Sequence, residues 1–175
     1  MASRSLPGPQ VKMWSAGRLH FGGKRTGTVI PVEEVGTDPE RHKLWREEAA
    51  QRYNDYAQGY PWKFNKFRAT AGYASVPLDG VLIRAPFLHN GSVPNLRDLL
   101  EPPAQRPKVF YRGNDLFEPT KVGFVSNVSE DNGHHFFKYD TSLRGNSNAG
   151  HAGPTYGTEL TEDDKIALVE YLKTL

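Results

Sequence analysis

Glycine and proline constrain the fold of this chain more than any other feature of its sequence. Of its 175 residues, 17 are glycine and 13 are proline, which together exceed their share in an average globular chain. Both residue types interrupt helices and strands and favour turns. The sequence therefore predicts few regular elements, joined by long irregular connections. Its length suits one domain with a hydrophobic core of its own.

The chain contains no cysteine. Disulfides, thiolate zinc sites, cysteine nucleophiles, iron–sulfur clusters and the Cys-x-x-Cys-His motif that attaches haem are therefore excluded within it. Its 22 lysines and arginines nearly balance its 20 aspartates and glutamates. They are scattered along the chain, whereas a nucleic-acid site needs a basic stripe. We therefore expect no nucleic-acid partner.

The sequence also predicts where the folded unit begins. No stretch approaches the roughly 20 apolar residues of a membrane span, and the first residues lack the apolar core of a signal peptide. We expect no membrane span and, for the chain as written, a cytoplasmic location, unless an export signal was lost with an upstream region. Residues 1–28 are expected to form a poorly ordered arm or to be the remnant of an upstream region. Residues 29–175 are expected to form the folded unit.

A mainly α fold is predicted from apolar spacing and capping residues. Thr37 and Glu40 are spaced as a capping box, and Thr161 is placed to cap the last helix. Alternating and aromatic runs between residues 107 and 140 add a small antiparallel β element. The predicted helices cover residues 39–57, 93–100 and 162–174. The predicted core comprises Trp45, Tyr53, Leu78, Val81, Phe87, Leu96, Leu99, Val169 and Leu172.

Six histidines are the candidate catalytic or metal-binding side chains of the chain. None of them forms a helical i, i+4 pair or a His-Glu-x-x-His motif. His134 and His135 follow an Asp-Asn-Gly sequence, which is typical of a solvated turn and also compatible with a weak metal site. Together with Asp131 or Asp140 they would make a non-haem metalloenzyme or a hydrolase, which is a third candidate function.

Two histidines differ from the rest by their sequence context. His89 follows an apolar run and precedes a turn, so its imidazole is expected at the edge of the core. His151 ends a loop of mostly small residues, Gly145-Asn-Ser-Asn-Ala-Gly-His151. Such a backbone can approach a large flat ligand closely and direct one imidazole at its centre, and neutral imidazole is a good ligand for iron. Alternatively, each histidine hydrogen-bonds to backbone in a buried corner.

Four blocks of sequence match one known pattern in the same order. They are Val76-Pro-Leu-Asp-Gly80, residues 84–100 (RAPFLHNGSVPNLRDLL), residues 145–151 and residues 164–175 (DKIALVEYLKTL). The chain thereby resembles the C-terminal part of di-haem c-type cytochromes of the bacterial cytochrome c peroxidase superfamily, and most of all their rubber-oxygenase-like branch. The resemblance is specific from about residue 70 to 175 and looser back to Val29.

The resemblance implies a fold and a haem site. Cytochrome c-like helices, long Gly/Pro-rich loops and the small β element would enclose haem c, and the chain would serve electron transfer. His151 corresponds to the distal axial ligand of the haem iron, and His89 and Asn90 shape the loop at the haem edge. The remaining residues implied to lie against the cofactor are Gly145, Asn146 and Gly150.

The chain departs from this family in one respect. Relatives attach haem through Cys-x-x-Cys-His, which lies upstream of the part present here. A haem-attaching partner is therefore implied, either an upstream segment or a separate cytochrome chain. We expect no independent enzymatic activity, although a complete relative would be a haem oxidoreductase of the peroxidase or oxygenase type, and periplasmic if exported. The alternative is a haem-free structural or interaction domain with an aromatic surface around Tyr60–Phe67.

Overall fold

The computed structural model describes residues 28–62 and 66–175. The arm predicted over residues 1–28 lies, except for its last residue, outside the described part. Five α-helices occur within these ranges, and the longest have 11 residues. They are α1 (Val32–Val35), α2 (Glu40–Leu44), α3 (Glu47–Ala57), α4 (Leu96–Leu99) and α5 (Glu162–Leu172). Three short 3-10 helices cover Val81–Ile83, Pro103–Gln105 and Pro154–Tyr156.

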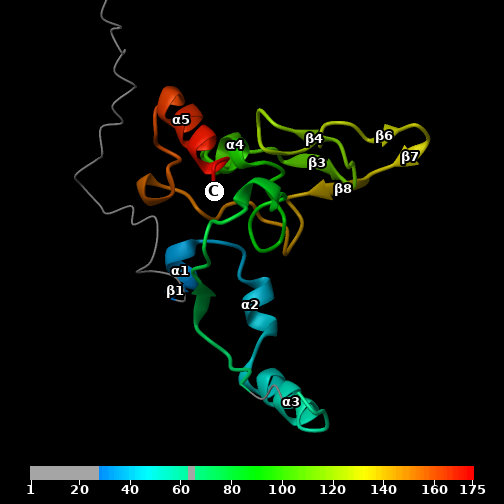
Figure 1. Ribbon diagram of the computed structural model, residues 1–175, viewed down its shortest axis with the longest axis vertical. Helices are drawn as coiled ribbons and strands as arrows, with labels where there is room; N and C mark the ends of the chain where they lie inside the picture. Colours follow the sequence, from blue (N-terminus) through cyan, green and yellow to red (C-terminus); the bar gives the residue numbers. More distant parts are fainter. Residues whose placement is uncertain (1–27, 63–65) are drawn as a thin grey trace, which may run out of the picture.

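The strands pair only in twos, as four antiparallel sheets. β1 (Val29–Pro31) pairs with β2 (Gly72–Ala74), and β3 (Val109–Arg112) pairs with β8 (Phe137–Asp140). β4 (Phe117–Glu118) pairs with β5 (Gly123–Phe124), and β6 (Glu130–Asp131) pairs with β7 (His134–His135). Strands β3 to β8 extend from the body as a long projection, whereas α2 and α3 form a second projection on another side (Figure 1).

The prediction of a mainly α fold is wrong. Helices make up about 30% of the described residues and strands about 17%. The helix predicted over residues 39–57 is broken between α2 and α3, where Trp45 and Arg46 leave the helical conformation. The helix predicted over 93–100 shrinks to the four residues of α4. The remainder of the described residues forms bridges, turns and loops, as the glycine and proline content predicts.

Of the two helix caps expected from the sequence, the one at Thr161 is formed and the one at Thr37 is not. The hydroxyl of Thr37 bonds to His89 instead of closing a capping box. At α4 the cap is Asn95, whose side chain accepts the backbone N–H of Asp98. At α5 the prediction is confirmed, because the hydroxyl of Thr161 accepts the backbone N–H of the third helical residue.

The hydrophobic core lies between α4, α5 and the segment around residues 81–93. Five of the nine predicted core residues belong to it, and Leu99 packs against it. Tyr53 and Leu78 are wrong, since they are 53% and 41% exposed. The observed core comprises Val81, Phe87, Val93, Leu96, Leu100, Val122, Val169 and Leu172.

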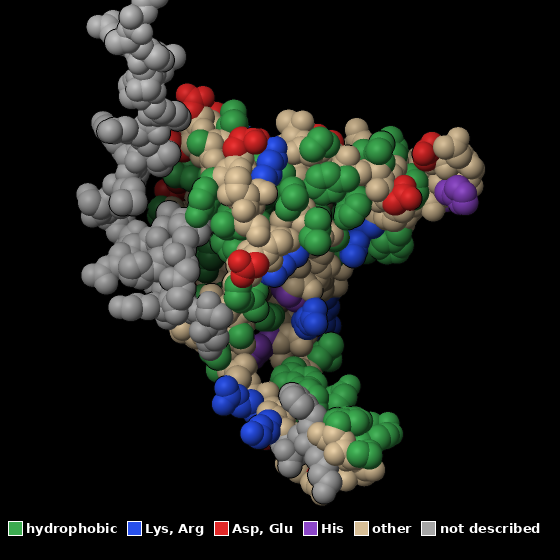
Figure 2. Space-filling model, viewed as in Figure 1, with side chains coloured by type: hydrophobic (Ala, Val, Ile, Leu, Met, Phe, Trp, Pro, Cys, Tyr) green, Lys and Arg blue, Asp and Glu red, His purple; other side chains and the backbone are tan. Residues whose placement is uncertain are grey.

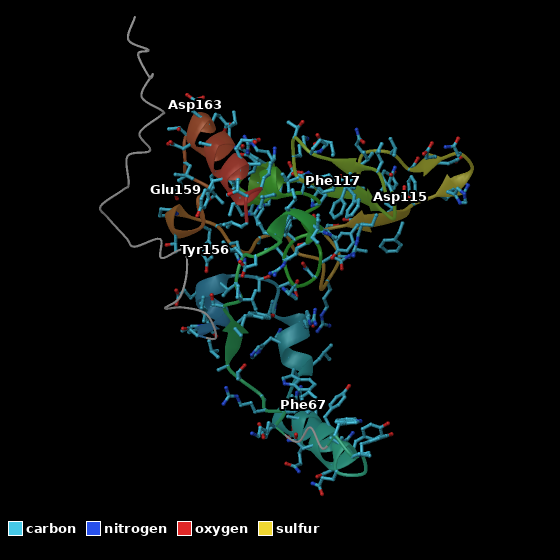
Figure 3. The ribbon with its side chains drawn as sticks, viewed as in Figure 1. Phe67, Asp115, Phe117, Tyr156, Glu159 and Asp163 are labelled. Atoms are coloured by element: carbon cyan, nitrogen blue, oxygen red, sulfur yellow. The ribbon has the colours of Figure 1, made fainter. Side chains whose placement is uncertain are left out.

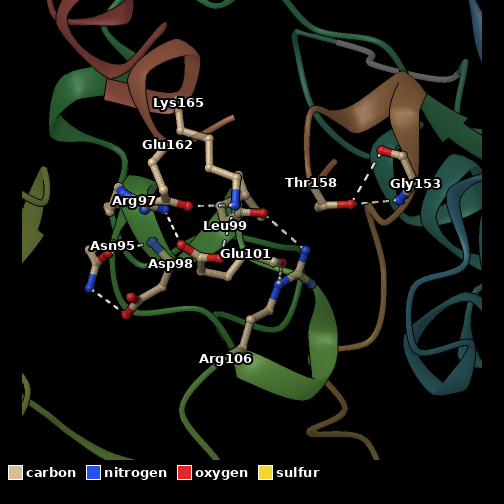
Figure 4. A network of polar contacts seen from close by, with 10 residues as sticks. All are labelled: Asn95, Arg97, Asp98, Leu99, Glu101, Arg106, Gly153, Thr158, Glu162 and Lys165. Carbon is tan, nitrogen blue, oxygen red and sulfur yellow. Dashed lines mark hydrogen bonds and ion pairs between the residues drawn. The ribbon is translucent and has the colours of Figure 1, made fainter. Parts of the chain in front are cut away.

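A buried ionic network joins α5 to α4 (Figure 4). The ammonium of Lys165, which is 4% exposed, lies 3.0 Å from a carboxylate oxygen of Glu101 and 3.3 Å from one of Glu162. Arg97 pairs with the same two carboxylates. These contacts fix α5 against the segment that leads into the candidate site. No helix among the described residues is both long and apolar enough to cross a membrane.

Candidate functional site

The glycine-rich loop of residues 145–151 is held by polar contacts to the loop that follows His89. The side-chain amide of Asn90 donates to the carbonyl oxygens of Gly145 and Ser147, at 3.1 and 2.9 Å. The hydroxyl of Ser92 donates to Ser147 as well, at 3.0 Å. The structure therefore brings the two predicted site segments together, although they lie about 55 residues apart in the chain.

Arg106 holds the other end of this loop. Its side chain is almost fully enclosed, and its guanidinium donates to the carbonyl oxygens of Asn148, Gly150 and His151 at 2.5, 2.6 and 2.9 Å. Sequence reasoning missed this residue, because no local pattern distinguishes a buried arginine from a solvated one.

His151 lies at the end of the loop with both backbone polar groups bonded. Its N–H donates to the carbonyl of Val35 in α1 at 3.0 Å, and its φ is +55°. The imidazole packs 4.8 Å from the ring of Tyr156, centroid to centroid. Tyr156 lies between α5 and α1 (Figure 3), where its hydroxyl donates to the carbonyl of Glu34 at 3.3 Å.

The electrostatics of this site keep His151 neutral. Burial, with the nearby charge of Arg106, lowers its pKa from 6.5 to about 4. Nδ1 of the ring is buried and has no hydrogen-bond partner among the described residues. A buried polar atom without a partner is rare in proteins and calls for an explanation. A neutral imidazole is the form that ligates metal.

His89 lies close enough to His151 to contribute to the lowered pKa of His151. Its Nδ1 and the hydroxyl of Thr37 are hydrogen-bonded at 2.9 Å, and its ring stacks on Tyr73 at 5.4 Å. Burial lowers the pKa of His89 below its ordinary value. The hydroxyl of Tyr73 is the second buried side-chain atom without a partner in the described part of the chain. The sequence indicated Thr37 only as a helix cap, and it did not single out Tyr73.

The two glycines of the loop have different roles: Gly150 permits close packing, and Gly145 adopts a positive φ. A Cβ added to Gly150 would lie 2.6 Å from Cα of Thr37, so this glycine permits the loop to approach α1's end. A Cβ on Gly145 would meet nothing within 4 Å, and its φ is +87°. The amide of Asn146 donates to the carbonyl of Asp140 at 3.0 Å. The loop therefore approaches another segment of the chain at Gly150.

The histidines of the β hairpin do not form a metal site with their neighbours. His134 and His135 lie exposed in β7 at the end of the hairpin (Figure 2). His135 lies 3.1 Å from a carboxylate oxygen of Glu130. Among the described residues, no group of three or more His, Asp or Glu side chains could hold a metal ion. The described residues therefore contain no metal-binding cluster of the kind that the sequence suggested around His134 and His135.

A cavity of about 310 Å³ opens between β3 and β5, away from the glycine-rich loop. Its apolar walls include Pro86, Pro94, Phe110 and Phe124, and Arg112 lines its polar side. None of its lining residues belongs to the loop of residues 145–151. It is therefore separate from the imidazole of His151.

Residues 72–111 match the family model described as RoxA-like, cytochrome c-like. This segment of the chain is therefore similar to a cytochrome c-like domain. It contains His89 and Asn90, and it ends just after Arg106. The match agrees with the sequence resemblance in that part of the chain.

Two curated proteins of Sinorhizobium fredii (strain NBRC 101917 / NGR234) are similar over a longer stretch. One is the uncharacterized protein y4iJ, 44% identical over 117 residues, and the other is the uncharacterized protein y4iM, 36% identical over 126 residues. The matches cover 63% and 61% of this chain but only 19% and 28% of the relatives. The chain thus spans less than a third of the length of either relative.

Proposed function

We propose that this chain is the part of a haem-associated electron-transfer protein that supplies a distal axial histidine. His151 would bind the iron, and His89 and Asn90 would form the loop at the haem edge. In finer terms, the complete protein would be a di-haem cytochrome of the peroxidase superfamily, and periplasmic if exported. The bound haem would supply one-electron transfer.

The observation that carries this proposal is the imidazole of His151. It is neutral, it has a buried nitrogen without a partner, and it ends a loop bonded to the cytochrome c-like segment. These properties suit an axial ligand, because the ligand must be unprotonated and oriented by the protein around it.

The chain's residues fit one side of a haem and not a complete attachment site. The sequence has no cysteine for thioether bonds, and the carbonyls of the loop at residues 145, 147, 148, 150 and 151 already accept hydrogen bonds. The covalent tether and the proximal histidine must therefore come from a Cys-x-x-Cys-His segment outside this sequence. That segment would be upstream in the same protein or on a partner chain.

The test is a visible spectrum of the chain with haem supplied, alone and co-expressed with the upstream segment. We expect a Soret band whose position changes in His151→Ala and stays unchanged in His134→Ala. The second variant is the matched control, since His134 is an exposed histidine that could bind haem adventitiously. Absence of a Soret band under both conditions, or a band indifferent to His151→Ala, would refute the assignment.

A haem-free interaction domain is the second candidate, and the aromatic side chains of the α3 projection favour it. Tyr53, Tyr56 and Trp62 are more than half exposed, and Figure 2 shows apolar side chains gathered at that end of the molecule. Exposed apolar patches commonly mark interaction sites. Light scattering and pull-down with the purified chain test it, and a colourless monomer that captures no partner would contradict it.

A further inference from the structure

Arg106 is a buried charge whose position is set by stiff backbone. It directly follows the 3-10 helix Pro103–Gln105, behind two consecutive prolines, and only 2% of the residue is exposed. Burial lowers its pKa to about 10, so the guanidinium is charged at neutral pH. An enclosed charge is tolerated only where its donors are satisfied.

All five N–H donors of this guanidinium meet backbone carbonyl oxygens. Nε donates to Glu101 at 2.9 Å and Nη2 donates to Leu99 at 3.0 Å, as Figure 4 shows. The other three donors go to Asn148, Gly150 and His151. Two bonds thus fix the guanidinium to the segment after α4, and three attach the glycine-rich loop to it.

These bonds determine the direction in which His151 leaves the backbone. Its carbonyl accepts from Nη2 of Arg106, and its N–H donates to Val35. With the preceding carbonyl of Gly150 also bonded to Arg106, the two peptide groups around the Cα of His151 are both held. The imidazole is then directed against the ring of Tyr156.

We propose that Arg106 is the positioning residue for His151: it holds the loop so that the imidazole occupies one fixed orientation, the one in which it meets the iron. The role toward iron rests on the proposed function, whereas the fixed orientation of the ring exists in the haem-free chain. Lysine cannot replace arginine here. Its ammonium carries three donors at one point, whereas the five carbonyls surround a planar fork.

The test compares Arg106→Lys with Arg144→Lys. Arg144 precedes the same loop and is the matched control, because its side chain is 84% exposed and pairs only with Glu40 among the described residues. The first readout is hydrogen exchange of the amides of residues 147–151. The second is the chemical shifts of the His151 ring protons. The ring current of Tyr156, 4.8 Å away, should change these shifts, and the two rings should give a nuclear Overhauser effect. The third is the spectrum with haem supplied.

In Arg106→Lys we expect exchange of the loop amides to accelerate by about tenfold or more. We also expect the His151 ring protons to lose the chemical-shift change that the ring of Tyr156 causes. With haem supplied, the His151-dependent band should weaken. Arg144→Lys should leave all three readouts near wild type. If the loop loosens while the His151 ring signals stay as in wild type, Arg106 is a structural contact only and the proposal is wrong.

The ring signals also separate this proposal from the proposed function. A wild-type chain without any haem band refutes the function, and the His151 ring signals then still decide the role of Arg106. If Arg106→Lys does not fold, as judged by lost protection of α5, the wild-type chain decides instead. Its Arg106 side-chain N–H protons should exchange slowly and its loop amides should be as rigid as those of α5. Fast exchange of either set overturns the proposal.

Discussion

Replacing Gly150 by alanine tests whether the glycine-rich loop approaches α1 as closely as described. The added methyl group would lie 2.6 Å from Cα and 2.9 Å from the backbone nitrogen of Thr37. Real Cβ atoms do not approach backbone so closely, and no side chain can rotate away to make room. One of the two backbone segments must therefore move.

The cost follows from the contacts that such a movement would lose. Overpacking costs about 1–3 kcal/mol. Displacing the loop also weakens the bond from the N–H of His151 to Val35 and the one between Thr37 and His89, each worth about 1 kcal/mol. We expect Gly150→Ala to lower the free energy of unfolding by about 2–4 kcal/mol.

Urea unfolding followed by circular dichroism measures this loss. The midpoint should fall by about 1–2 M at the usual slope for a chain of this size. Gly59→Ala is the matched control, because its Cβ would lie 3.6 Å from the nearest atom and its φ is ordinary. It should change the free energy of unfolding by less than about 1 kcal/mol. A Gly150→Ala chain within about 0.5 kcal/mol of wild type would refute the close approach.

Three further predictions concern α5 and the pH dependence. Thr161→Ala removes the cap of α5 and should destabilise the chain by about 1 kcal/mol in calorimetry; no change would mean that the cap is not formed. Lys165→Ala removes a buried ammonium and leaves the partly buried carboxylate of Glu101 paired with Arg97 alone, and it should cost about 3 kcal/mol in urea unfolding. Lys173→Ala, which breaks a pair with an exposed carboxylate, should cost under about 1 kcal/mol, and equal losses would contradict the buried network. Because the pKa of His151 falls from 6.5 to about 4 on folding, the unfolded chain binds more protons between these values. Stability of the haem-free chain should thus rise by up to about 3 kcal/mol from pH 4 to 6.5, and His151→Asn should flatten that rise when unfolding is measured across this range.

Elements with a local signal could be predicted from the sequence. The cap at Thr161 and the apolar positions of α5 lie within one short stretch, so the helix and its buried Val169 and Leu172 followed directly. The break between α2 and α3 has no such signal. There the indole of Trp45 donates to the carbonyl of Arg68, 23 residues away, and this tertiary contact accompanies the departure from helix.

The prediction that Tyr53 of α3 belongs to the core was wrong for a related reason. Spacing shows which side chains share a face but not what that face meets. Trp45, Tyr53 and Phe67 pack on one another with ring centroids 5.4 to 6.2 Å apart, apart from the core. Tyr53 therefore remains half exposed although its helical position is that of a core residue.

Within the candidate site, the sequence indicated the segments but not what holds them. His89 and His151 were indicated by their sequence context and, together with Asn90, by a family resemblance, and the structure places their loops in contact. The clamp at Arg106 could not be predicted, because the loop carbonyls that it bonds lie 42 to 45 residues further along the chain. The small residues of the loop were expected to approach a large flat ligand, whereas Gly150 approaches Thr37 of the chain itself.

The loop that carries His151 also has a place in the order of folding. The side-chain bonds that attach it to Asn90, Ser92 and Arg106 span 42 to 57 residues. Contacts across such separations form only after the entropy of closing the intervening chain has been offset. We therefore expect the loop to order late, once the segment around α4 has already formed. The imidazole of His151 would then take its fixed orientation against Tyr156 only in completely folded molecules.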